Sequence, residues 1–73
     1  MFDKKIFSQR LSNLRISKNI SRTGLALELG LSYDSVAKME KAERACSVEI
    51  LYALSKYFDV SSDYLLGLSD SPK

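Results

Sequence analysis

The sequence predicts an all-α protein, a compact domain of five short helices. Three observations support this class. Apolar residues recur three and four positions apart, serines precede most of the repeating segments, and no segment shows the alternation of a β-strand. A chain of 73 residues has room for one hydrophobic core. We expect the domain to cover residues 1–68 and residues 69–73, which lack core-forming side chains, to be a flexible C-terminal tail.

The first helix is expected from about Lys5 to Lys18. Phe7, Leu11 and Leu14 stand at positions i, i+4 and i+7, which places them on one side of a helix.

The second and third helices form the most informative stretch of the chain. Ser21 is expected to cap a helix that ends near Leu29, and Ser32 a helix that runs to about Lys41. Only a short turn with Gly30 lies between them, and glycine is common just past a helix end. Two helices joined so tightly are typical of the helix-turn-helix motif, whose DNA-binding version lays the second helix in a major groove.

The fourth and fifth helices complete the domain. Ser47 is expected to cap the fourth and Ser61 the fifth, which ends at Gly67. Their apolar residues are Ile50, Leu51, Leu54, Tyr57 and Phe58 in the fourth helix, and Tyr64, Leu65 and Leu66 in the fifth.

The helix starts differ in charge. Three of the serine caps are followed two positions later by an acid, namely Asp34, Glu49 or Asp63, which favours the helix dipole. After Ser21 comes Arg22, with no carboxylate in the first turn. We therefore interpret this helix start and the Arg22 guanidinium as lacking an internal anion. A DNA phosphate is one partner for such an end, and water is the alternative.

The charge distribution agrees with a nucleic-acid partner. Residues 1–44 carry nine Lys/Arg and five Asp/Glu, a net charge of +4, whereas residues 45–73 carry two and four, a net charge of −2. Six basic residues and no acidic one lie in the segment from Lys4 to Arg22. Such a run is expected of a phosphate-binding face, although an ordinary solvated surface would also show it.

The composition argues against several classes of protein. The chain has no histidine, no glycine-rich phosphate loop and no cluster of metal ligands, so we expect no enzyme, no cofactor and no metal site. No apolar run approaches the roughly 20 residues of a membrane span, and we expect no membrane or small-molecule partner. The single cysteine, Cys46, cannot form an internal disulfide and favours a cytoplasmic location.

The chain resembles the lambda-repressor-like, or xenobiotic-response-element, family of helix-turn-helix regulators, the phage repressor and Cro type. The resemblance covers about residues 7–67 and implies a five-helix domain that binds operator DNA as a homodimer, with the third helix in the major groove. It is carried by Ile20-Ser21-Arg22, Leu25-Ala26, Leu29-Gly30-Leu31-Ser32, Lys38-Met39-Glu40 and Tyr64-Leu65-Leu66-Gly67.

The resemblance also implies roles for individual residues. Base-reading positions would be Tyr33, Asp34, Ser35 and Lys38, and phosphate contacts would come from Ser21, Arg22, Lys41 and Arg44. Arg15 would form a structural ion pair with Glu40. Asp34 can either accept from a cytosine amino group or cap the helix dipole. Family members usually have glutamine at Arg22, glycine or asparagine at Ala42 and often proline near Cys46, so this chain departs from the family pattern at one phosphate contact and in the loop after the third helix.

Two functions follow from these patterns. The first is a transcriptional regulator, expected to be a repressor, that binds double-stranded DNA as a homodimer through Tyr64, Leu65 and Leu68. The alternative is a protein-interaction module, antitoxin-like or anti-repressor-like, that keeps the fold. Asp34 on the reading face favours this alternative, whose partner would contact Leu27, Tyr57, Tyr64 and Leu68.

Overall fold

The computed structural model describes residues 1–73 and contains five α-helices and no strand. The helices are α1 (Lys4–Ser17), α2 (Arg22–Leu29), α3 (Tyr33–Glu40), α4 (Val48–Phe58) and α5 (Ser62–Leu66). The predicted all-α class and the number of helices are confirmed. No helix combines the length and the apolar character needed to cross a membrane.

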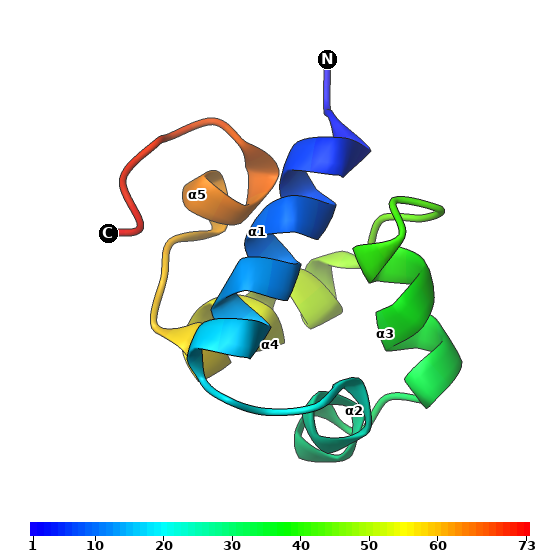
Figure 1. Ribbon diagram of the computed structural model, residues 1–73. Coiled ribbons are helices and arrows are strands. Elements are labelled where there is room, and N and C mark those ends of the chain that lie inside the picture. The colour runs from blue at the N-terminus through cyan, green and yellow to red at the C-terminus, as the bar shows by residue number, and fades with distance from the viewer.

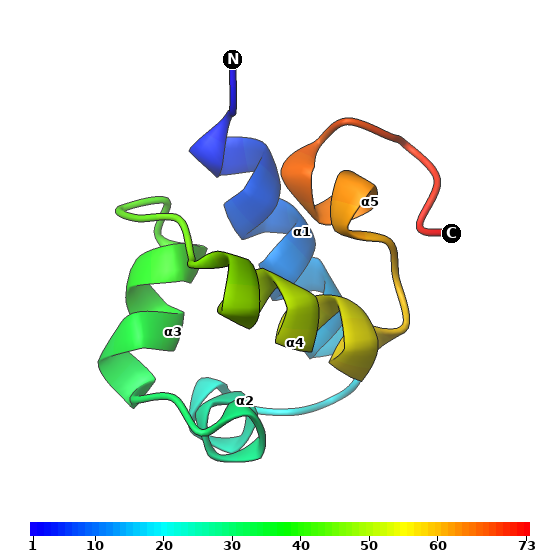
Figure 2. The same cartoon turned by 180° about the vertical axis from the view of Figure 1, so that it is seen from behind.

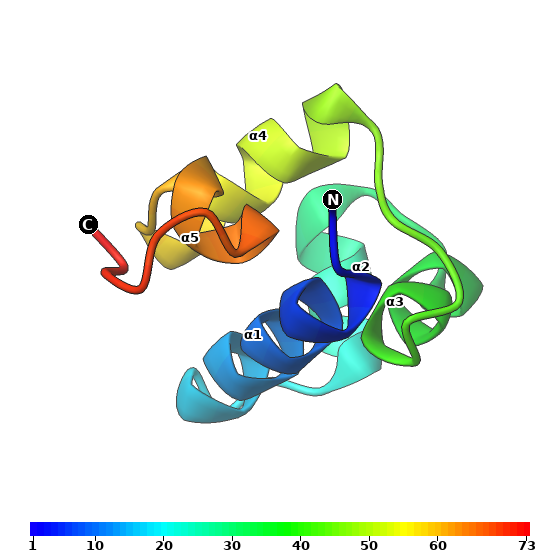
Figure 3. The same ribbon diagram turned by 90° about the horizontal axis from the view of Figure 1, so that it is seen from above.

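The helices surround α1, which lies between α3 and α5 and packs against both (Figure 1). From behind, α4 crosses the molecule and contacts α5 and α2 (Figure 2). Seen from above, α4 and α5 lie together on one side, and α2 and α3 lie together on another (Figure 3). The two helices of the predicted helix-turn-helix are therefore neighbours in space, and α3 forms an outer edge of the molecule.

Every helix contributes at least one fully buried side chain to a single core. The largest fully buried side chains are Phe7 and Leu11 from α1, Leu25 from α2, Val36 and Met39 from α3, Leu54 from α4 and Leu65 from α5. Isolated helices shorter than about 12–15 residues are marginal in water. The eight-residue helices α2 and α3 therefore depend on this shared core for their stability.

All five helices begin with a side-chain cap. The predicted serine caps are present, and each hydroxyl accepts a bond from the backbone N–H three residues later, at Ser21, Ser32, Ser47 and Ser61. In α1 the cap is Asp3, whose carboxylate accepts from the N–H of Lys5 at 2.8 Å. The cap at Asp3 was not among the predicted ones.

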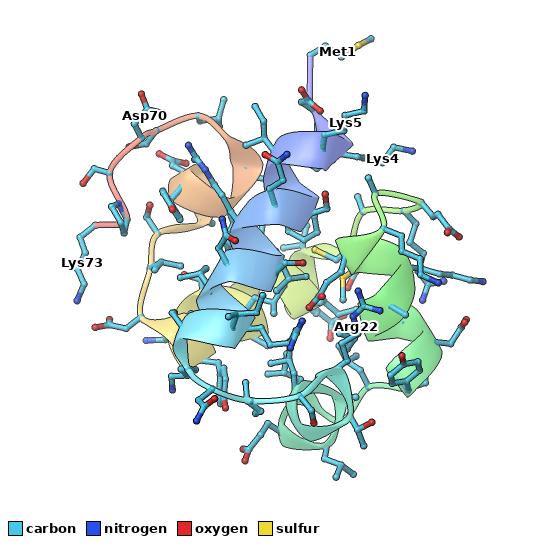
Figure 4. All side chains as sticks on the ribbon, viewed as in Figure 1. Met1, Lys4, Lys5, Arg22, Asp70 and Lys73 are labelled. Carbon is cyan, nitrogen blue, oxygen red and sulfur yellow. The ribbon has the colours of Figure 1, made fainter.

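The segment after α5 curves back along the molecule. Arg10 of α1 donates to the carbonyl oxygen of Ser69 at 2.7 Å and to the carboxylate of Asp70 at 3.2 Å. Asp70 and Lys73 both lie on this segment as it passes α5 (Figure 4). The flexibility expected for residues 69–73 stays a prediction. In the structure, the bonds from Arg10 hold the first part of this segment against α1.

Candidate nucleic-acid interface

The two sides of α3 differ completely in exposure. Val36 and Met39 are fully buried and anchor one side in the core. On the opposite side, the Asp34 and Lys38 side chains, one turn apart, reach solvent. Tyr33 is 53% exposed, but it lies at the start of the helix on the side of Arg22. Asp34 and Lys38 are thus the expected base readers that share one accessible face.

Asp34 and Lys38 form an ion pair on that face. The Lys38 ammonium lies 3.2 Å from the Asp34 carboxylate, one helical turn away. Exposed pairs of this kind contribute only about 0.3–0.5 kcal/mol, so a DNA phosphate or base can displace either partner. Asp34 also lies in the first turn of α3, so a base contact and a dipole-capping role both remain open for it.

Ser35, the fourth expected reader, is half-buried and already hydrogen-bonded. Its hydroxyl oxygen accepts from the Ser32 hydroxyl at 3.0 Å and from the Arg44 guanidinium at 2.6 Å. Arg44, which the sequence placed among the phosphate ligands, therefore lies against the first turn of α3.

The carboxylate of Glu40 joins three helices. Its side chain is fully buried at the end of α3. Arg15 of α1 donates to it twice, at 2.7 and 3.2 Å, and Arg22 of α2 donates once, at 3.0 Å. In Figure 4 the Arg22 side chain lies among α1, α2 and α3. The structure thus brings the two members of the expected structural pair together and adds Arg22.

This network keeps Glu40 charged. Burial acts to raise the pKa of Glu40, but hydrogen bonds from Arg15, Arg22 and Ser12 outweigh it and hold the pKa below its ordinary value. The hydrogen bond to Glu40, with a smaller contribution from the Tyr33 hydroxyl, raises the pKa of Arg22. Both partners are ionised at neutral pH, and the start of α2 is tied to the end of α3.

The interpretation of Arg22 as a residue without an internal anion was wrong. Glu40, 18 positions later in the chain, is that anion. The basic run from Lys4 to Arg22 also does not form one phosphate-binding face, because Arg10 points to the C-terminal segment and Arg15 to Glu40. Spacing along a helix gave no signal for partners so distant in sequence.

The other proposed phosphate ligands are exposed. Ser21 stands at the start of α2, where its hydroxyl accepts from the N–H of Gly24 at 3.0 Å. Lys41 follows the last residue of α3. Lys4 and Lys5, at the start of α1, line a shallow depression together with Ala42 of the loop after α3. Exposed basic side chains therefore flank α3 at its C-terminal end.

The expected dimer contacts differ in accessibility. Leu65 is fully buried in the core, so it cannot contact a second copy and is excluded as a dimer contact. Tyr64 is half-buried, with the Arg10 guanidinium 4.2 Å above its ring. Leu68 is 76% exposed. It adjoins an apolar depression that also includes Phe2 and Leu66.

The surface expected for a protein-interaction module is not continuous. Leu27, on α2, is 78% exposed. Tyr57 is half-buried, and the Lys18 ammonium covers its ring at 4.2 Å. Cations therefore cover one face of the Tyr57 ring and one face of the Tyr64 ring.

The short turn between α2 and α3, the anchored inner side of α3 and its exposed polar side define a helix-turn-helix domain of the DNA-binding type. The chain belongs to this family, since the family model described as "Helix-turn-helix" matches residues 11–65.

Three curated relatives carry names of the same kind. The chain is 33% identical over 67 residues to the uncharacterized HTH-type transcriptional regulator YobD of Bacillus subtilis and 35% identical over 61 residues to the HTH-type transcriptional activator BcrR of Enterococcus faecalis. It is 30% identical over 70 residues to the HTH-type transcriptional regulator PrpR of Mycobacterium tuberculosis. These matches cover 92%, 84% and 96% of the chain, but only 60%, 30% and 14% of the respective relatives.

A solved structure shows the same fold. The restriction-modification controller protein C.AhdI from Aeromonas hydrophila matches with a TM-score of 0.78 and 32% identity, over 86% of this chain and 96% of that protein. The matched proteins are regulators, so the expectation of a DNA-binding regulatory domain rather than an enzyme is confirmed at the level of the family.

Proposed function

We propose that the chain binds double-stranded DNA sequence-specifically, with α3 in the major groove of an operator. The observation that carries this proposal is the division of α3 between a side anchored by the core and Glu40 and an accessible side with Asp34 and Lys38, beside which the loop residue Arg44 lies. A major groove about 12 Å wide accepts a helix about 10–12 Å across. The Glu40 network would hold α3 in a constant orientation while its outer side contacts base edges.

Phosphate contacts would position the domain on the duplex. Ser21 and the free N–H groups of the first turn of α2 would bind one phosphate. Lys41, with Lys4 and Lys5 nearby, would bind phosphates beside the other end of α3. Such contacts set orientation without reading sequence.

The active form would be a homodimer. Exposed Leu68 and Val48, together with Phe2, provide apolar surface away from the reading side of α3, and a second copy would cover it. A two-fold dimer of this motif reads half-sites about 34–36 Å apart. We also propose repression as the regulatory outcome, because a dimer seated on a promoter blocks its use, and the cytoplasm as the location, because that is where such an operator would be found.

Selection of bound sequences from a random duplex pool tests this function. We expect a palindrome whose half-sites are one helical turn apart. Binding should weaken steeply with salt, with a log–log slope of about −0.9 for each phosphate contacted. Lys41→Gln should reduce this slope by about one unit, whereas the matched change Lys56→Gln on α4 should leave it unaltered. Selection of no duplex at low salt would favour the protein-interaction module instead.

A reporter gene separates repression from activation. With the selected operator placed across the promoter, expression should fall when the protein is present. One relative is named an activator, so an increase would keep the DNA-binding proposal and reverse the regulatory one.

A further inference from the structure

Arg44 is the only arginine of the chain without a carboxylate partner. The other three are paired within the molecule: Arg10 with Asp70, and Arg15 and Arg22 with Glu40. Arg44 is exposed and its one side-chain partner is the neutral hydroxyl of Ser35. Its positive charge and most of its donors are therefore available to a ligand.

The turn after α3 brings Arg44 to this position. Ala42 adopts a left-handed conformation, with φ of 61°. The next N–H, that of Glu43, donates back to the carbonyl oxygen of Lys38 at 3.0 Å. The chain thus reverses at the end of α3 and runs back beside it, so that Arg44 reaches Ser35, nine positions earlier in the sequence.

The hydroxyl of Ser35 has no acceptor site left for a base. A serine hydroxyl has one donor and two acceptor sites. Both acceptor sites are occupied, one by the Ser32 hydroxyl and one by Arg44. The Ser32 oxygen also accepts from the N–H of Ser35 at 3.1 Å, which fixes the pair of serines to the helix start. Ser35 is thus held as an anchor for the Arg44 side chain.

We infer that Arg44 determines specificity by reading a guanine in the major groove and that Ser35 positions it; this inference rests on the proposed DNA-binding function. Of the five N–H donors of a guanidinium, Ser35 uses one. The remaining donors suit the paired acceptors N7 and O6 of guanine, which arginine contacts in a bidentate manner. The bond to Ser35 keeps the guanidinium against the first turn of α3, one helical turn from the exposed Lys38 on the side that would face the bases.

Sequence selection with matched variants tests the inference. The variants are Arg44→Gln, Arg44→Lys and Ser35→Ala, with Lys41→Gln as the control, and thermal unfolding checks that each one folds. Wild type and Lys41→Gln should select the same sequence. Arg44→Gln should lose the preference for one guanine by about tenfold. Arg44→Lys, which keeps the charge without the planar fork, should retain affinity but not this preference.

Ser35→Ala provides the decisive comparison. We expect it to weaken the preference at the same base pair as Arg44→Gln, and to a smaller extent, because the guanidinium is present but no longer held. A loss at a different base pair would show that Ser35 reads its own base. An unchanged selected sequence with uniformly weaker binding in Arg44→Gln would make Arg44 a phosphate ligand. Both results overturn the inference but keep DNA binding, whereas selection of no duplex by wild type removes the proposed function itself.

Discussion

At the scale of single residues, the carboxylate of Glu40 joins α1, α2 and α3, and their arrangement depends on it. It is buried and receives bonds from Arg15 and Arg22. A buried charge without partners is strongly unfavourable. The stability lost on removal of a donor should therefore be larger for a donor that is more buried and makes more bonds to the carboxylate. Arg15 makes two bonds to Glu40 and a third to the carbonyl oxygen of Ile20, at 2.8 Å.

Removal of Arg15 should therefore cost more stability than removal of Arg22. We expect Arg15→Met to lower the free energy of unfolding by about 3 kcal/mol, since it leaves a buried carboxylate with one arginine. Arg22→Met should cost about 1 kcal/mol, because its side chain is 32% exposed and makes a single bond. Denaturant unfolding measures both values. Unchanged stability of Arg15→Met together with weaker DNA binding would instead identify Arg15 as a DNA ligand.

The same network predicts a loss of stability in acid. Because folding lowers the pKa of Glu40, its contribution is complete above the unfolded value of 4.5 and disappears as the pH falls through the folded value. Wild type should thus lose stability below about pH 4.5 more steeply than Glu40→Gln, whose side chain does not titrate. Thermal unfolding across this range tests the difference. Parallel curves for the two proteins would show that other carboxylates cause the acid sensitivity.

At the scale of elements, α2 and α3 both end in a chain reversal, but different residue types form the two reversals. Each chain reversal requires a left-handed residue, which is Gly30 after α2, with φ of 68°, and Ala42 after α3, with φ of 61°. Glycine adopts this conformation without strain, whereas alanine does not. The turn that brings Arg44 to the face of α3 therefore contains a local weak point.

Ala42→Gly should stabilise the protein. We expect a gain of about 1 kcal/mol in the free energy of unfolding, from the relief of left-handed strain. Ala53→Gly, inside α4, is the matched control and should lose about 1 kcal/mol, because glycine is a poor helix former. Denaturant unfolding of both variants provides the comparison. Destabilisation by both changes would mean that the turn at Ala42 gains nothing from glycine.

On the scale of the whole molecule, the candidate DNA-binding side and the exposed apolar surface are neighbours that meet at Phe2, which lines one depression with Lys4 and Lys5 and another with Leu68. The exposed side of α3 and its flanking lysines are the candidate DNA-binding side. Apolar surface collects where Phe2 at the N-terminus meets α4 and the end of α5. Leu68 and Val48 are among the most exposed apolar side chains. A second copy that covered this region would leave both α3 helices free to bind DNA.

Leu68→Glu should therefore prevent self-association and weaken operator binding. Leu27→Glu is a suitable control, since Leu27 is equally exposed but lies on α2. Sedimentation should show a dimer for the wild type and for Leu27→Glu, and a monomer for Leu68→Glu. Equal effects of the two changes, or none from Leu68→Glu, would place the dimer contact elsewhere.

The sequence by itself determined the five helices and the capped starts of the last four. Caps such as Ser32 and helix ends such as Gly30 depend on bonds to residues only three to five positions away, so their pattern is readable along the chain. The helix-turn-helix class was predictable for this reason. The base-reading residues, in contrast, were implied only by the resemblance to the lambda-repressor-like family.

Only the tertiary structure decided which charged side chains are available to a ligand. Arg22 is paired with a carboxylate 18 positions away, and Arg10 with one 60 positions away. Leu65, expected at a dimer contact, is buried, while Arg44 reaches Ser35 through the reversal at Ala42. Ion pairing and burial depend on distances in space, and five short helices around one core bring together residues whose separation in sequence gives no such signal.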